Sequence, residues 1–220
     1  MKNKLLSFVV LAIVGACISS CSKDDDGPTP TLDKTNITLN VGEKAWLSYS
    51  GGNCEWSTDN KYIASVKNGE VTAEHVGATI IHANELTCTV TVLPKNTTYY
   101  EPCYDWAARI NDVKKYMSGY TIKGDTNTEL VYAGKGEIIG YVYMFENGIL
   151  KSSGFLVSLS NVVDLVDFLL ERYVVIDTDS NSNTYYLMSV DQKTIVVLNV
   201  SKSGGSVVYF NAKNQSVIKI

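Results

Sequence analysis

The chain has 220 residues, with 19 Lys and Arg against 23 Asp and Glu and a formal net charge of −4. An acidic chain without a basic cluster argues against nucleic acid as a partner and against recruitment by anionic lipid. The 14 tyrosines and the many Val, Ile and Thr runs favour a mostly β or α+β fold, and the length is sufficient for two small domains.

The first 20 residues have the pattern of a secretory signal peptide. Lys2 and Lys4 form a positive n-region, and residues 5–16 form an apolar run that is shorter than the roughly 20 residues needed to span a bilayer. We therefore expect residues 1–20 to be removed on export. Both lysines are lost with them, so the formal charge moves from −4 to −6.

The end of this leader, Ile18-Ser19-Ser20-Cys21, resembles the bacterial lipobox. Ile18 is the aliphatic residue, the two serines are small enough for the extended backbone to approach the peptidase, and the Cys21 thiol carries the lipid. Residues 14–17 fit the same pattern and offer Cys17 as the alternative. Lipidation at Cys21 implies anchoring to a membrane, because several acyl chains together hold a protein essentially permanently.

Residues 21–32 are predicted to be a tether that begins with the lipidated Cys21 and an acidic run. The sequence Ser-Lys-Asp-Asp-Asp at residues 22–26 is similar to the export signal of surface lipoproteins in Bacteroidota. A solvated tether explains the same run of charges, and both interpretations can hold together. The resemblance implies a lipid anchor in the outer membrane at the cell surface, with the periplasmic face of that membrane as the alternative.

Residues 33–94 carry short alternating apolar segments separated by turn signals, which favours a β-sandwich. Asn68-Gly69 is a strong two-residue hairpin signal. The expected strands cover residues 37–41, 46–49, 54–56, 63–66, 71–73, 79–81 and 88–92.

Several motifs in this segment resemble the bacterial immunoglobulin-like group 2 domain of intimin- and invasin-type surface proteins. They are LNVGE at 39–43, WST at 56–58, IASV at 63–66, NGEVTA at 68–73, VGATII at 76–81 and VTV at 90–92. The resemblance implies an immunoglobulin-like β-sandwich that serves as a spacer or as an adhesin module, and the fold alone does not choose between these roles.

Three further cysteines follow Cys21, and an exported protein is in a compartment that permits disulfides. Cys54 and Cys88 stand near the start of a middle strand and of the last strand of the first domain, and we predict that they form a disulfide. Closing this loop would stabilise the fold by roughly 3–4 kcal/mol. Two buried free thiols are the alternative. Cys103 is predicted to be a buried packing thiol.

Residues 95–102 are predicted to be a linker, and residues 103–220 a C-terminal α+β domain. Trp106, Ile110, Val113 and Met117 fall on one helical face, and a second helix is expected at 162–172 with Asn161 as its N-cap. The expected strands cover residues 129–133, 137–145, 149–158, 173–177, 184–189, 194–200 and 206–211.

This order predicts one antiparallel sheet with two helices on a single face. Residues 120–122 and 173–175 are similar in sequence and occupy similar places, which indicates an internal αβββ duplication, with coincidence as the alternative. In strand 137–145, Ile139, Tyr141, Tyr143 and Phe145 share one face. That face either packs on the helices or is open to stack on sugar rings or receive a partner.

No group of residues predicts catalysis, a cofactor or a metal. The only two histidines, His75 and His82, lie in the first domain. Residues 177–183 begin like a calcium loop, but they lack Gly at the sixth position and have Met188 at the twelfth, so a polar hairpin loop is expected. Asp164, Asp167 and Glu171 are expected on a solvated face of the second helix.

Together these features predict a non-enzymatic, lipid-anchored cell-surface binding or adhesion protein, whose first domain presents the second to an extracellular glycan or protein. The alternative is a structural accessory subunit that docks onto an outer-membrane complex. An exposed Tyr/Trp cleft in the C-terminal domain would favour glycan binding. A broad apolar face would favour docking, and convergent buried carboxylates would favour a hydrolase.

Overall fold

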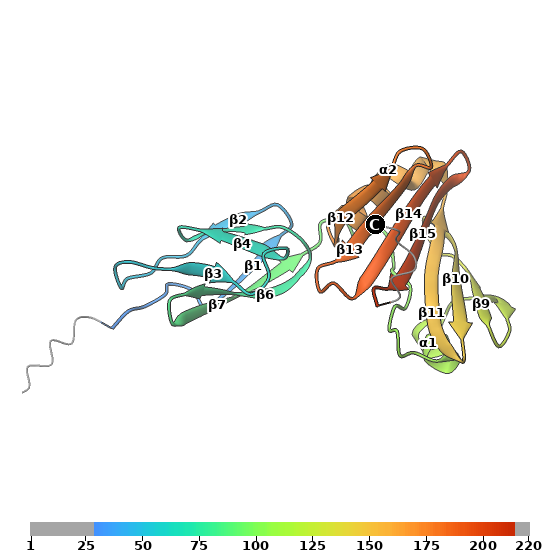
Figure 1. The fold of residues 1–220 in the computed structure, drawn as a ribbon, viewed down its shortest axis with the longest axis horizontal. Coiled ribbons are helices and arrows are strands. Elements are labelled where there is room, and N and C mark those ends of the chain that lie inside the picture. Colours follow the sequence, from blue (N-terminus) through green and yellow to red (C-terminus); the bar gives the residue numbers. More distant parts are fainter. Residues whose placement is uncertain (1–28, 214–220) are drawn as a thin grey trace, which may run out of the picture.

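The structure is a computed structural model that describes residues 29–213 (Figure 1). Within this range it contains 15 β-strands, two α-helices and one short 3-10 turn, which confirms a mostly β, α+β chain. The predicted leader, Cys17, Cys21 and the acidic run lie outside the described residues.

Residues 31–94 form a first unit of two sheets that share one apolar core (Figure 1). One sheet has the order β1-β7-β6-β3 and the other β2-β5-β4. Val90 and Ile81 enter the core from the first sheet, and Val71 and Ala64 from the second. The strands are β1 (Asn36–Asn40), β2 (Lys44–Trp46), β3 (Trp56–Thr58), β4 (Ala64–Lys67), β5 (Glu70–Ala73), β6 (Gly77–Ala83) and β7 (Leu86–Leu93).

The turn between β4 and β5 is the hairpin that the sequence predicts. Asn68 and Gly69 both have positive φ angles, 53° and 88°. Two successive positive φ angles match the right-handed twist of the flanking strands, and Asn-Gly accepts them at little steric cost. A Cβ atom at Gly69 would lie 2.5 Å from the carbonyl oxygen of Leu47. Only glycine therefore allows the backbone at Leu47, in the loop before β3, to approach this hairpin so closely.

The predicted disulfide between Cys54 and Cys88 is not formed, and both residues are free thiols. Strand β6 lies between β3 and β7, which separates those two strands by about 9–10 Å. Across the sheet, Cys88 pairs with Ile81, and Ile81 pairs with Thr58 on β3. Cys54, in contrast, lies two residues before β3 begins. A disulfide needs Cα atoms within about 7 Å, so the strand order rules this pairing out.

Residues 99–213 form a second unit around one antiparallel sheet, with the order β12-β13-β14-β15-β11-β10-β9-β8. Each half of the unit is a helix followed by four strands in a meander, and β11 pairs with β15 where the halves meet. The elements are α1 (Ile110–Tyr116), β8 (Ile122–Asp125), β9 (Glu129–Ala133), β10 (Ile138–Glu146), β11 (Ile149–Val157), α2 (Val162–Leu170), β12 (Tyr173–Asp179), β13 (Thr184–Ser189), β14 (Thr194–Ser201) and β15 (Gly204–Asn211).

Both helices pack on the same face of this sheet, which we call the inner face (Figure 1). Val113 and Met117 of the α1 region and Leu165 and Phe168 of α2 join the sheet residues in one core. Of the two interpretations of strand 137–145, packing on the helices is confirmed, because Tyr141, Tyr143 and Phe145 are all buried. The outer face of the sheet has no helix over it within the described residues.

Three details differ from the prediction. A β-bulge between Ile138 and Gly140 turns Ile139 outward, where it is 60% exposed, and buries Ile138 in its place. Helix α1 begins at Ile110, so Trp106 lies before it in a turn. Strand β8 was not predicted, because its sequence Ile-Lys-Gly-Asp does not alternate between apolar and polar residues.

Candidate functional site

The segment at residues 99–105, most of it predicted to be a linker, belongs to the second unit. Tyr99 is buried in the core, where its ring makes an edge-to-face contact with the Phe168 ring at a centroid distance of 5.3 Å. Its hydroxyl donates a 2.8 Å hydrogen bond to the carbonyl oxygen of Asn161. The Tyr141 hydroxyl donates to the carbonyl oxygen of Tyr100 at 2.9 Å. The backbone of this segment therefore supplies a hydrogen-bond acceptor for a hydroxyl group that the sheet carries into the core, as buried polar groups require.

Glu101 is the centre of this arrangement. Its Oε1 atom accepts hydrogen bonds from the hydroxyls of Tyr173, at 2.5 Å, and Tyr209, at 3.2 Å. The two tyrosines come from β12 and β15, so the carboxyl group ties the segment to two distant strands of the sheet.

Burial sets the protonation of this cluster. It raises the pKa of the Glu101 carboxyl above its ordinary value, and it outweighs the hydrogen bonds from Tyr173 and Tyr209 and the nearby Arg172 charge, which lower that pKa. Burial also raises the pKa of both tyrosines, so their hydroxyls stay protonated and act as donors. A strongly perturbed carboxyl group beside an open cavity is a candidate functional group.

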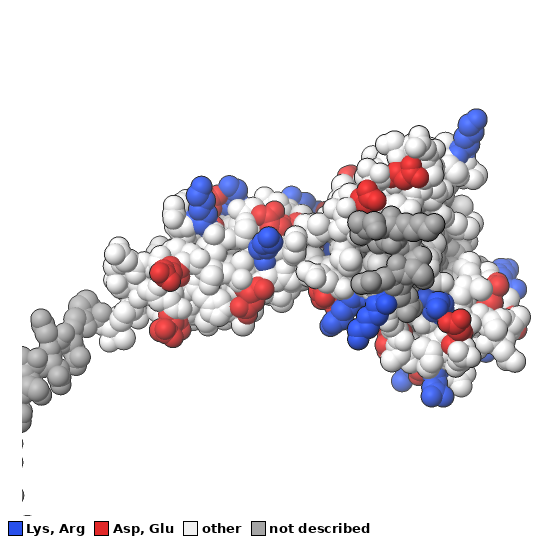
Figure 2. Space-filling model, in the orientation of Figure 1, with Lys and Arg blue, Asp and Glu red and all other residues white. Residues whose placement is uncertain are grey.

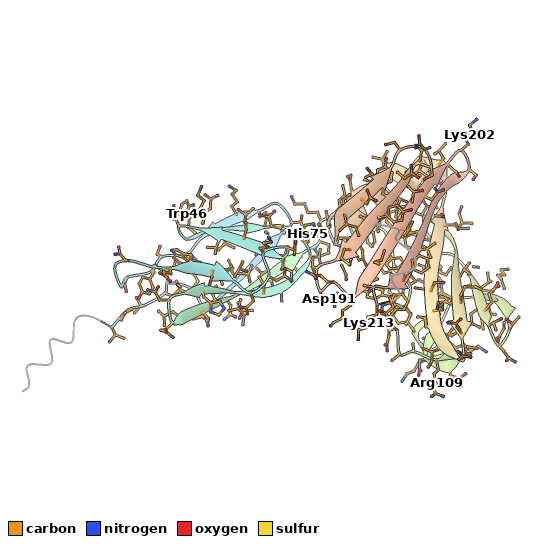
Figure 3. All side chains as sticks on the ribbon, viewed as in Figure 1. Trp46, His75, Arg109, Asp191, Lys202 and Lys213 are labelled. Carbon is orange, nitrogen blue, oxygen red and sulfur yellow. The ribbon has the colours of Figure 1, made fainter. Side chains whose placement is uncertain are left out.

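Glu101 lines a cleft of about 480 Å³ where the two units meet. Figure 3 shows the borders of this region, with His75 on the first unit and Asp191 on the second. The volume is within the roughly 300–1,000 Å³ that is usual for small-molecule sites. The lining consists of Val76 from the first unit and of residues 101, 104–107, 172–173, 189–191 and 193–194 from the second.

Aromatic side chains form one wall of the cleft in fixed orientations. The Tyr104 ring is parallel to the ring of the fully buried Tyr209, with an interplanar angle of 5° and centroids 5.7 Å apart, yet Tyr104 is 40% exposed. The indole N–H of Trp106 donates to Thr194 Oγ1 at 3.1 Å. The cleft thus combines aromatic surface with several carboxyl groups, which is typical of a binding site for a polar ligand.

A tight joint connects the two units beside the cleft. The Glu171 carboxylate accepts hydrogen bonds from the backbone N–H groups of Lys95 and Asn96, both at 2.9 Å, and its backbone carbonyl accepts from Val76 N at 2.7 Å. Arg172 donates to the carbonyl oxygen of Asn96 at 2.9 Å. Glu171 is therefore not on a solvated face as predicted, and its side chain is only 13% exposed.

The other residues singled out from the sequence lie apart from the cleft or have structural surroundings. Cys103 is buried as predicted, and burial raises the pKa of its thiol. His75 Nδ1 lies 2.6 Å from the carbonyl oxygen of Tyr62, and His82 Nε2 lies 2.8 Å from Asp59 Oδ1. No three His, Cys, Asp or Glu side chains among the described residues gather in a way that would hold a metal ion.

Residues 177–183 form the predicted polar hairpin: residues 177–179 end β12, and residues 180–183 make the turn to β13. Asp179 Oδ1 accepts a hydrogen bond from Asn181 N at 2.9 Å, and Oδ2 accepts from Ser182 Oγ at 2.7 Å. These bonds lower the pKa of the Asp179 carboxyl, and they occupy oxygens that a calcium ion would need.

We therefore expect calcium in millimolar excess to leave the melting temperature of the chain unchanged, as measured by circular dichroism. Magnesium at the same concentration is the control for general salt effects. A rise in melting temperature with calcium alone, lost in Asp179→Ala, would show that the loop binds this ion.

Comparison of the chain with protein-family models and with curated proteins gives no match. Within residues 29–213, none of the helices combines the length and the apolar character needed to cross a membrane. Sequence reasoning did not single out Glu101, Tyr104 or Tyr173. The one available signal was the density of aromatic and acidic residues at 99–106, directly before a helical pattern.

Proposed function

We propose that this chain is a lipid-anchored binding protein of the outer membrane, displayed at the cell surface, and that the cleft at the joint receives its ligand. The observation that carries the proposal is the cleft, which is lined by Tyr104 and Trp106 together with the half-buried Glu101. The lipobox-like leader and the acidic run after Cys21 support the location.

In this proposal the first unit is a domain similar to the bacterial immunoglobulin-like group 2 family and serves as a spacer. Two sheets around one core, with β1 parallel to β7, support that assignment. We also propose that the second unit arose by internal duplication. Its two helix-plus-four-strand halves, with β11 and β15 paired at the centre, support an αββββ repeat in place of the αβββ repeat predicted from the sequence.

We infer a binding role and not a catalytic one. Acid–base hydrolysis of glycosides commonly uses two carboxyl groups that flank the bond to be broken. In the cleft Glu101 is half-buried and its Oε1 holds two core tyrosines in place, whereas Asp105 and Asp191 are exposed. These surroundings favour carboxyl groups that bind a ligand over a pair of carboxyl groups that acts as acid and base.

The location is tested by treating intact cells with a protease and following the second unit with an antibody. We expect its signal to disappear while a periplasmic protein stays intact. Cys21→Ala is the matched variant, because without the lipid the chain should leave the membrane fraction. Full protection of the second unit in intact, uncapsulated cells would overturn surface display.

A second candidate function, an accessory subunit docked on an outer-membrane complex, is supported by the outer face of the sheet. Two successive rows across β13, β14, β15, β11 and β10 contain no charged residue: Met188, Ile195, Phe210, Ser152 and Met144, and Tyr186, Val197, Val208, Gly154 and Val142. In Figure 2 the Lys, Arg, Asp and Glu side chains that are visible on the second unit lie at its upper end and in its lower part.

An antiparallel sheet that faces water on one side usually alternates apolar and polar residues, so these rows fit a partner protein with an apolar, uncharged surface. The complex could lie on the periplasmic or the surface side of the outer membrane, and the chain is protected in intact cells only if it lies on the periplasmic side. If this second function is correct, Val208→Lys should release the chain from a sedimenting membrane complex without lowering its melting temperature, whereas Lys202→Ala at the sheet end should not.

A further inference from the structure

We propose that the ligand of the cleft is a neutral saccharide of one or two rings, which stacks on Tyr104 and Trp106 and donates hydroxyl hydrogen bonds to the carboxyl groups of Glu101 and Asp105. This inference rests on the proposed function, because it names the ligand class of the same cleft.

The stacking surface is preorganised. Tyr209 covers one side of the Tyr104 ring and fixes its plane, and the hydrogen bond to Thr194 fixes the Trp106 indole. Fixed aromatic rings lose little conformational entropy when a ligand binds. The faces of a pyranose ring expose C–H groups and its rim carries hydroxyls, so such a ring suits an aromatic surface with polar groups around it.

Two carboxyl groups of the cleft, those of Glu101 and Asp105, offer hydrogen-bond acceptors. Glu101 Oε1 and Asp105 Oδ1 accept bonds from the protein, the latter from Ala107 N at 3.0 Å. Among the described residues, the second oxygen of each carboxyl group accepts no hydrogen bond, which leaves it for a donor on the ligand. A ligand with many hydroxyl donors satisfies these acceptors, whereas a phosphate or sulfate group would be repelled.

The charge of the lining also favours a neutral ligand. Two cationic side chains are present, but both are already engaged: Arg172 donates to the carbonyl oxygens of Phe168 and Asn96, and Lys193 lies 3.3 Å from Asp191 Oδ2. Arg172 is therefore not a free partner for an anionic sugar, and the charge of Lys193 is offset by that of Asp191. The volume of about 480 Å³ limits the enclosed part of the ligand to a small unit of a longer glycan.

The test titrates the purified full chain by isothermal titration calorimetry with neutral mono- and disaccharides, their sulfated or uronic acid counterparts, and choline as a cationic probe. We expect saturable binding of at least one neutral sugar. Tyr104→Ala and Trp106→Ala should each weaken it by about tenfold or more. Trp46→Ala is the matched control, because Trp46 is 60% exposed on β2, far along the first unit (Figure 3).

Each result has a defined meaning. Selective binding of an anionic sugar or of choline would overturn the ligand class, as would the absence of binding by every neutral sugar. Binding that survives Tyr104→Ala in a chain with an unchanged circular dichroism spectrum would overturn the site. Surface display is measured separately by protease treatment, so the ligand class can fail while the proposed location stands.

Discussion

Glu171→Ala is expected to destabilise the chain by about 2–4 kcal/mol and to split its unfolding into two transitions. The Glu171 carboxylate accepts two backbone hydrogen bonds at the joint, from Lys95 and Asn96, and a hydrogen bond to a charged group contributes about 1.5–3 kcal/mol. Alanine would leave both N–H groups without this partner and weaken the link between the two units. Urea unfolding followed by tryptophan fluorescence would measure the effect, because Trp56 is in the first unit and Trp106 in the second.

Asp167→Ala is the control for this variant. It removes the same charge from the same helix, but Asp167 is exposed and its carboxylate makes no hydrogen bond to the joint within the described residues. A single transition with unchanged midpoint in Glu171→Ala would show that the remaining contacts at the joint, which include the hydrogen bonds from Val76 N and Arg172, suffice to couple the units. The joint also matters for binding, since it borders the cleft.

Glu101→Gln is expected to stabilise the folded chain at neutral pH and to flatten the pH dependence of its stability. The folded pKa of Glu101 is raised above the ordinary value of 4.5, so the folded chain holds this proton more tightly than the unfolded chain. The contribution of Glu101 is therefore fully present below pH 4.5 and is lost as the pH rises through the folded pKa. A difference of one between folded and unfolded pKa is worth about 1.4 kcal/mol.

The measurement is the free energy of unfolding of the wild type, Glu101→Gln and Asp105→Asn between pH 4 and pH 8. Asp105→Asn is the matched control, because Asp105 lines the same cleft but is exposed. If Glu101→Gln unfolds more easily than the wild type at neutral pH, the ionised carboxylate is favourable in the fold and its pKa is not raised. A variant that is more stable but binds sugar less well would mark Glu101 as a residue kept for function.

The second unit was largely predictable because its strands have clear periodicity. Alternation across residues 137–145 identified β10 and showed which tyrosines share a face, and helical spacing identified α2, although Phe168 was not expected among its buried residues. The bulge at Ile139 was not predictable, because residues 138 and 139 are both isoleucine, so the sequence does not show which of them faces the core.

The first unit shows where sequence spacing misleads. Cys54 and Cys88 have a plausible separation for a disulfide, but their distance depends on strand order, and β6 intervenes between their strands. The candidate site was hidden for a related reason. Glu101 lies in an irregular segment, and its partners Tyr173 and Tyr209 are 72 and 108 residues further along the chain.

The central pairing of the sheet has a consequence for how the second unit acquires its structure. Each meander is built from neighbouring strands, whereas Ser153 on β11 pairs with Tyr209 on β15, 56 positions later. Non-local ladders form slowly, because loop-closure entropy is lost before the contacts are gained. During synthesis, β11 therefore emerges with an edge that stays open, and prone to aggregation, until β15 has followed it.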